Sequence, residues 1–98
     1  MIQHTVSFTL RHPADSAEED AFLADAAEIL AAIPGVQDFR VSRQVSRKSD
    51  HRFQFAMDFV DDAAYARYNE HPAHVRFVET RWANEVADFQ ELDLVPLS

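Results

Sequence analysis

The order in which two hydrophobic periodicities follow each other is the feature that most limits the fold of this chain. Residues 2–10 alternate between apolar and polar side chains, which is typical of a strand buried on one face. Apolar residues then recur at helical spacing at Phe22, Ala26, Ile29 and Ile33. The chain therefore begins with a strand and an amphipathic helix, and both patterns return in its later segments.

Capping and turn residues predict where these elements begin and end. Ser16 followed by Glu19 is a capping box, which marks the start of the first helix. Pro34-Gly35 ends that helix, because the only glycine of the chain can take the positive φ of a helix stop. Further on, Asp61-Asp62 starts a second helical region, which Pro72 interrupts.

Three further segments predict strands, over residues 36–45, 52–60 and 86–95. The complete order is β-α-β-β-α-β, which is the split βαβ arrangement of the ferredoxin-like α+β fold. We therefore expect an antiparallel four-stranded sheet with both helices on one face. Since a chain of 98 residues suits one domain, we predict a single domain over residues 1–98.

Two helices cover only one face of such a sheet, so the opposite face is left open. We expect this open face to carry Phe39 or its alternates together with Leu92 and Leu94. An exposed apolar face is removed from water when a second sheet packs on it. The expected partner is therefore a second copy of the chain, in a homodimer with twofold symmetry.

Composition excludes several classes of protein. The net charge of −8 opposes general binding to nucleic acid, whose phosphates are also negative. The absence of cysteine excludes disulfides, a thiolate nucleophile and a zinc–thiolate site. No apolar run reaches the length of a membrane span, and the first residues do not form a signal peptide. We expect a cytoplasmic protein that does not bind membranes.

Five of the nine basic residues lie within thirteen positions: Arg40, Arg43, Arg47, Lys48 and Arg52. One interpretation is a solvated hairpin edge, where positive charges prevent unwanted strand pairing. The other is a rim that attracts anions. The first is favoured, because no phosphate-binding motif accompanies the charges.

The segment from Tyr68 to His74 carries the chemistry of the chain, with the sequence Tyr-Asn-Glu-His-Pro-Ala-His. Proline disfavours a helical conformation in the residue before it and suits the first position of a helix. His71 is therefore predicted as an N-cap and His74 as the third residue of a new helix. Tyr68 and His74 can then face each other across the break. The helix N-terminus also favours a neutral His74 ring, as a general base or a metal ligand requires.

Each of these residues also has a structural interpretation. A tyrosine at a helix end often serves packing, His71 can be a cap alone, and His74 can be a hydrogen-bonded core residue. His4, His71 and His74 are three potential metal ligands, but their spacing is not that of a usual ligand set. We predict no metal and no cofactor.

The chain resembles the stress-responsive dimeric α/β-barrel (Dabb) family over nearly its whole length. The resemblance rests on His4 in the first strand, on Ile33-Pro34-Gly35-Val36, on the Tyr-x-x-His-Pro-x-His segment and on Trp82. It implies that two ferredoxin-like subunits close an eight-stranded barrel with the helices outside. Most members have no established activity.

One characterised member is the plant polyketide cyclase olivetolic acid cyclase. The resemblance of this chain to the cyclase implies that Tyr68 and His74 act together as catalytic residues, with His4 beside them in a pocket between sheet and helices. We hypothesise that His74 removes a proton from a carbon between two carbonyls and that Tyr68 stabilises the resulting oxyanion. Five residues are expected to contact the substrate: Phe22, Leu23, Phe55, His71 and Trp82.

Two alternatives remain beside this cofactor-independent cyclase-like enzyme. The first is a non-catalytic dimer that binds a small apolar or polyketide-like ligand or is associated with stress. The second, less favoured, is an oxygenase or isomerase of another dimeric ferredoxin-like type. Fold alone does not separate these functions.

Overall fold

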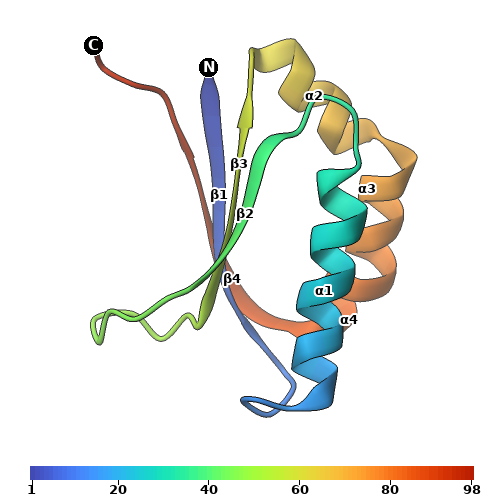
Figure 1. Ribbon diagram of the computed structural model, residues 1–98, viewed down its shortest axis with the longest axis vertical. Coiled ribbons are helices and arrows are strands. Elements are labelled where there is room, and N and C mark those ends of the chain that lie inside the picture. The colour runs from blue at the N-terminus through green and yellow to red at the C-terminus, as the bar shows by residue number, and fades with distance from the viewer.

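The computed structural model describes residues 1–98 and contains an antiparallel sheet with helices on one of its faces (Figure 1). The elements follow in the order β1 (Ile2–Leu10), α1 (Ala17–Ala31), β2 (Gln37–Arg43), β3 (Phe53–Phe59), α2 (Asp62–Glu70), α3 (Pro72–Phe77), the π-helix η1 (Val78–Trp82), α4 (Ala83–Glu85) and β4 (Val86–Leu94). The strand order in the sheet is β2-β3-β1-β4. This is the predicted ferredoxin-like fold, and the expectation is confirmed.

Strand β1 lies inside the sheet because it pairs with β3 on one side and with β4 on the other. Its alternating residues face the helices: Val6 pairs with Phe55 and Phe8 with Phe53, and all four side chains enter the core. Phe8 and Phe22 are fully buried. Each such phenylalanine stabilises the fold by about 1.5–3 kcal/mol relative to an exposed position. The alternation seen in the sequence therefore has its cause in one-sided burial.

The start of α1 differs in one detail from the predicted capping box. Ser16 Oγ accepts a hydrogen bond from the Glu19 backbone N–H at 3.2 Å, as expected. The Glu19 carboxylate accepts from the backbone N–H of Asp15 at 2.9 Å, instead of from that of Ser16. The reason is that the Ser16 N–H already donates to the carbonyl of Pro13. Glu19 is buried and also pairs with Arg52 at 3.3 Å, which ties the helix to the start of β3.

Strand β2 is shorter and less regular than predicted. Asp38 has a φ of 52°, and the pairing of β2 with β3 shifts by one residue between Gln37 and Arg40. The bulge turns Phe39 toward the helices, where its ring lies 5.5 Å from that of Phe55. The expectation that Phe39 lies on the open face is therefore wrong. Val45 lies beyond the strand and is 84% exposed.

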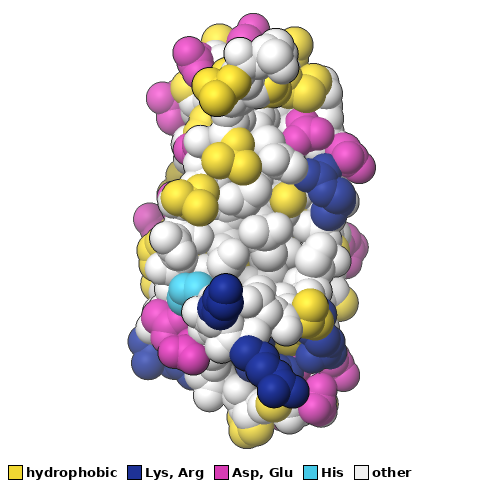
Figure 2. Space-filling model, turned by 90° about the vertical axis from the view of Figure 1, so that its left-hand side faces the viewer, with side chains coloured by type: hydrophobic (Ala, Val, Ile, Leu, Met, Phe, Trp, Pro, Cys, Tyr) yellow, Lys and Arg dark blue, Asp and Glu magenta, His cyan; other side chains and the backbone are white.

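The open face of the sheet is less apolar than expected. From β1 it receives the polar residues of the alternation, and from β4 it receives Leu92 and Leu94, which are exposed. Figure 2 views this face and shows hydrophobic side chains near one end, basic side chains near the other, and mostly uncharged polar surface between them. The apolar area is therefore concentrated on one edge strand. No helix of the structure combines the length and hydrophobicity needed to cross a membrane.

Helix α1 ends earlier than the sequence predicts, with Ala32 as its C-cap, and Gly35 lies three residues further on with a φ of 93°. It belongs to a turn that the Val36 N–H closes on the Ile33 carbonyl. A side chain at this position would meet Ala64 Cβ of α2 at 3.8 Å, an ordinary contact. Space therefore tolerates a methyl group, but the backbone conformation does not.

We predict that Gly35→Ala lowers the free energy of unfolding by about 1–2 kcal/mol, the cost of a left-handed conformation for a residue with a Cβ. Urea unfolding followed by circular dichroism measures this change. Gly35→Asn is the matched variant. Its free energy of unfolding should fall less than that of Gly35→Ala, since asparagine tolerates positive φ better than alanine. Equal stability of Gly35→Ala and the natural chain would contradict the prediction.

Candidate functional site

The helix break lies where the sequence places it. His71 has φ −61° and ψ 135°, an extended conformation, and its Nδ1 accepts a hydrogen bond from the Ala73 N–H at 3.1 Å. Pro72 is the first residue of α3, so His71 is the predicted N-cap and His74 occupies the third position. The break brings the ring of His74 to 4.5 Å from the ring of Tyr68, measured between centroids. The predicted approach of these two side chains is confirmed.

His74 is held as a neutral base. Its Nδ1 lies 3.1 Å from the carbonyl oxygen of Asn69, which can only accept, so Nδ1 carries the proton. The lone pair of Nε2 is then free. Burial lowers the pKa of His74 from its usual 6.5, and the nearby His4 lowers it further, against the opposing effect of the Asn69 carbonyl. Burial is the main cause of this lowered pKa, whereas the sequence indicated the helix N-terminus as the cause of the neutral ring.

Tyr68 is 2% exposed, and its hydroxyl has no hydrogen-bond partner in the protein. Burial raises the pKa of Tyr68, and the negative charge of Glu91 contributes in the same direction. The phenol therefore stays protonated and remains a hydrogen-bond donor at neutral pH. The hydroxyl atom itself is not closed off from the cavity that Tyr68 lines, so its hydrogen can be donated to a ligand.

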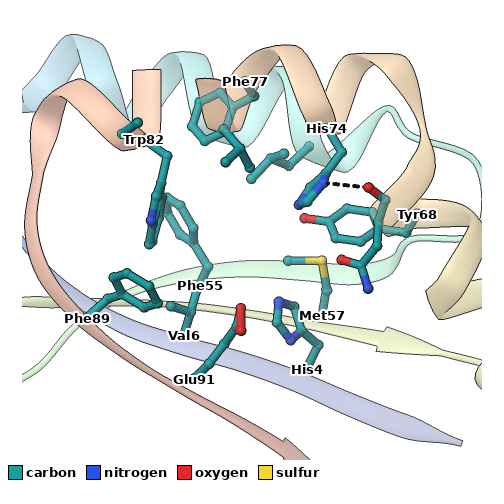
Figure 3. Close-up of a pocket in the computed structure, with 14 residues that line it drawn as sticks. His4, Val6, Phe55, Met57, Tyr68, His74, Phe77, Trp82, Phe89 and Glu91 are labelled. Carbon is teal, nitrogen blue, oxygen red and sulfur yellow. Dashed lines mark hydrogen bonds between the residues drawn. The ribbon is translucent and has the colours of Figure 1, made fainter. Parts of the chain in front are cut away.

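A cavity of about 480 Å³ lies between the sheet and the helices, within the size range of ligand sites (Figure 3). Fourteen residues line it, ten of them hydrophobic. They are His4, Val6, Leu30, Phe55, Met57, Tyr68, Asn69, His74, Phe77, Val78, Trp82, Ala83, Phe89 and Glu91. Because Phe89 is 52% exposed and Glu91 is exposed as well, the cavity is open to solvent on the side of β4.

His4 forms the floor of this cavity and is oriented by two residues. Its Nδ1 lies 2.6 Å from Asp93 Oδ1 and 2.9 Å from the Tyr65 hydroxyl. The Tyr65 hydroxyl also donates to Asp93 Oδ2 at 3.0 Å. Since the carboxylate can only accept, the proton of a neutral His4 ring resides on Nδ1, which leaves the lone pair on Nε2. Burial, followed by the hydrogen bond to Asp93, raises the pKa of Tyr65.

Sequence reasoning missed Asp93, Tyr65 and Glu91. One signal for two of them was present in the alternation of the last strand. If Leu92 and Leu94 lie on the open face, then Glu91 and Asp93 must face the helices. The pairing of His4 with Asp93 across β1 and β4 then brings the two side chains together. Tyr65 carried no comparable signal.

The five predicted substrate contacts divide into two groups. Phe55 and Trp82 line the cavity, as expected. Phe22, Leu23 and His71 do not line it. Phe22 is fully buried behind the cavity wall, with its ring 6.4 Å from that of Trp82, and the His71 ring is used in the helix cap. The latter three residues therefore support the fold around the cavity.

Trp82 reaches the cavity because η1 is a π-helix. The backbone N–H of Ala83 bonds to the carbonyl of Val78, five residues earlier, which rotates the following side chains relative to a regular α-helix. The Trp82 ring lies 5.2 Å from Phe8 and 5.5 Å from Phe89, so it closes one end of the cavity. No three histidine, aspartate or glutamate side chains lie close enough together to hold a metal ion.

Comparison with known families supports the sequence resemblance. Residues 2–96 match the family model described as the stress responsive A/B barrel domain, Dabb. A crystal structure of a Dabb family protein with a ferredoxin-like fold from Mesorhizobium loti is 56% identical, covers 99% of this chain and 97% of its own, and has a TM-score of 0.98. No curated protein matches the sequence.

Two more distant structures share the fold. Hydroxynitrile lyase from Passiflora edulis is 12% identical, with 99% of this chain and 94% of that chain covered and a TM-score of 0.84. The cofactor-independent oxygenase SnoaB from Streptomyces nogalater, as its N63A mutant, is 20% identical, with 99% and 93% covered and a TM-score of 0.73. At these identities the likeness concerns the fold alone.

The lowered pKa of His74 predicts a pH effect on stability. The unfolded chain binds a proton at this histidine near pH 6.5, whereas the folded chain binds it only at a lower pH. Stability should therefore decrease as the pH falls from above 6.5 through the folded-state pKa, and it should be unaffected above that range.

His74→Asn is the matched variant, because an asparagine amide can still donate to the Asn69 carbonyl but does not titrate. Between pH 7.5 and 5.5, its urea midpoint should fall less than that of the natural chain. An equal or larger fall in the variant would show that the His74 pKa is not lowered by folding.

Proposed function

Since the chain belongs to the stress-responsive A/B barrel (Dabb) family, we propose that it is a cofactor-independent enzyme that removes a proton from a carbon flanked by carbonyl groups. The closest reaction type is the cyclisation of a linear polyketide, as in olivetolic acid cyclase. We assign this activity to one cytoplasmic domain over residues 1–98. The catalytic residues in this proposal are His74 and Tyr68, with His4 as a third group.

The observation that carries the proposal is the unpaired Tyr68 hydroxyl. This hydroxyl makes no hydrogen bond within the protein and is not shut away from the cavity, so its donor is available to a ligand there. Here the hydroxyl faces the cavity beside a histidine whose Nε2 lone pair is also free (Figure 3). A donor and a base next to each other in an apolar cavity are the two groups that enolate chemistry needs.

The chemistry of the residues follows from their protonation states. Nε2 of His74 takes the proton from the activated carbon, and the C–H electron pair moves into the enolate. Tyr68 donates its hydrogen bond to the enolate oxygen, where negative charge develops. The enolate carbon then forms a bond to a second carbonyl of the same chain. The protonated His74 returns its proton to the alkoxide of this aldol step, so the enzyme ends in its starting state.

His4 enters this scheme from the floor of the cavity. Its ring is fixed by Asp93 and Tyr65, so its Nε2 keeps one orientation relative to Tyr68 and His74. In the proposal His4 acts on the second carbonyl of the substrate, through a water or after gaining a proton. Two enzymes share the fold, the hydroxynitrile lyase and the oxygenase named above, which supports the view that this architecture accommodates catalysis.

A second candidate function is the binding of a small apolar molecule without turnover. The composition of the cavity favours it, because ten of the fourteen lining residues are hydrophobic and would hold an apolar ligand without any reaction. In that case the Tyr68 hydroxyl would only orient the ligand. The two candidates differ in whether a product is formed.

We further propose that two copies of the chain associate through their open sheet faces. Proteins of this fold from Thermobifida fusca and Bacteroides fragilis are described as dimeric, at 16% and 18% identity. The exposed Leu92 and Leu94 on β4 supply apolar area for such a contact. Packing two sheets would close an eight-stranded barrel with the helices outside.

We predict that His74→Asn lowers the rate of cyclisation of linear β-polyketone thioesters by roughly 100- to 10,000-fold, because the general base is lost. Tyr68→Phe should lower the rate by roughly 100- to 1,000-fold, as expected for a missing oxyanion donor. Product formation is followed by mass spectrometry, and circular dichroism confirms that both variants fold.

Retention of the full rate by a folded His74→Asn protein would remove His74 from the mechanism. If the natural chain is thermally stabilised by these thioesters but forms no product above the buffer rate, the enzyme proposal fails and ligand binding alone remains.

We predict that Leu92→Lys together with Leu94→Lys converts the dimer into a monomer, because four buried charges would face each other across the two sheets. Light scattering after gel filtration measures the molar mass. Leu97→Lys is the control, since Leu97 lies beyond β4 and is fully exposed in the single chain. A natural chain that is monomeric at micromolar concentration would refute the proposed dimer.

A further inference from the structure

Glu91 is the one acidic side chain that lines the cavity, and it has no partner there. It lies on β4 opposite Val6 and faces the helices, between Phe89 and Asp93 in the alternation of that strand. None of the ion pairs or side-chain hydrogen bonds of the structure involves its carboxylate. In Figure 3 the two carboxylate oxygens point from the sheet into the cavity.

The charge of Glu91 is not balanced by any cation in the cavity. The fourteen lining residues include no lysine or arginine. The two histidines that line it keep their free Nε2 atoms as acceptors when neutral. The negative charge reaches the catalytic pair, because it raises the pKa of Tyr68 and acts on His74 in the same direction. The electrostatic potential inside the cavity is therefore negative.

Around this carboxylate the walls are aromatic and apolar. The ring centroid of Trp82 lies 6.3 Å from that of Phe55 and 5.5 Å from that of Phe89. Glu91 is exposed at the open side of the cavity, so a ligand that displaces water from its carboxylate must supply a hydrogen-bond donor or a positive charge in return. Aromatic faces also attract cations and repel anions. Both features select the same kind of ligand.

We propose that Glu91 sets the ligand specificity of this cavity, which takes a molecule with an apolar or aromatic body, a hydrogen-bond donor and no negative charge. The donor is a hydroxyl, which includes the enol hydroxyl of a β-polyketone, or a protonated amine, and it bonds to the Glu91 carboxylate. The inference rests on the proposed function only in taking the same cavity as the ligand site. It extends that function by requiring a donor on the substrate in addition to the carbonyl that Tyr68 binds.

Two polar groups, one hydrogen-bond donor and one acceptor, then hold the ligand. Tyr68 on the helix side offers a donor, and Glu91 on the sheet side offers an acceptor. A substrate with a carbonyl and a hydroxyl or amine at matching positions can satisfy both at once, and only in one orientation. Carboxylates and phosphates are repelled by Glu91 and find no counter-charge.

The test measures binding of four probes with the same aromatic body: phenylpropanol, phenylpropylamine, phenylpropanoate and phenylpropyl methyl ether. Dissociation constants come from ligand-observed NMR titration of the natural chain in its native assembly. We expect the alcohol and the amine to bind roughly 10-fold more tightly than the ether, as one charge-assisted hydrogen bond provides. The carboxylate should bind at least as weakly as the ether.

Two variants separate charge from hydrogen bonding. Glu91→Gln should keep the advantage of the alcohol, reduce that of the amine and relieve the exclusion of the carboxylate. Glu91→Leu should remove the advantage of both donors. Glu79→Leu is the control, because it removes the same charge from an exposed position of η1 outside the cavity, and it should leave the order of affinities unchanged.

The proposal is overturned if Glu91→Leu preserves the order of the four probes, or if the natural chain binds the carboxylate as tightly as the alcohol. It is also overturned if neither the alcohol nor the amine binds at millimolar concentration. These readouts involve no turnover, so a failed cyclisation assay with a positive binding result would refute the enzyme and leave this specificity intact.

Discussion

The missing backbone N–H of Pro72 is the local constraint on which the cavity depends. A continuous helix from Asp62 onward would carry His74 six residues beyond Tyr68, on a different side of the helix. Because proline cannot continue the helix, the chain turns at His71 and starts again in α3. The turn places an imidazole and a phenol from consecutive helices against each other. A single rigid residue thus creates the geometry of the Tyr68–His74 pair.

The polar groups around the cavity do not stabilise the fold in the usual way. The hydroxyl of Tyr68, the Nε2 atoms of His4 and His74 and the carboxylate of Glu91 all lack protein partners. None of these atoms is closed off from the cavity, so each remains available to a bound molecule. The aromatic core packed behind the cavity stabilises the fold without using them. A packed core beside a cavity with a few free polar groups is characteristic of binding sites.

Sequence periodicity was sufficient for the order of elements, for the face that each central strand buries and for the helix break. These features follow from local chemistry, as at Ser16, Gly35 and Pro72. The bulge at Asp38, the π-helix before Ala83 and the hydrogen bonds of Tyr65 could not be predicted in this way. Each depends on contacts between segments that are distant in the chain. The site was therefore predictable at the break and only partly predictable at the sheet.

Strand β4 serves both faces of the sheet with consecutive residues. Glu91 and Asp93 point toward the helices, whereas Leu92 and Leu94 point the other way. Because side chains alternate strictly, inserting or deleting one residue within the strand would exchange the two sets, sending leucines into the cavity and carboxylates onto the outer surface. The proposed ligand recognition and the proposed self-association thus depend on one register of backbone pairing. A substitution at one face leaves the side chains of the other face in place, whereas a change in the length of this strand alters both faces.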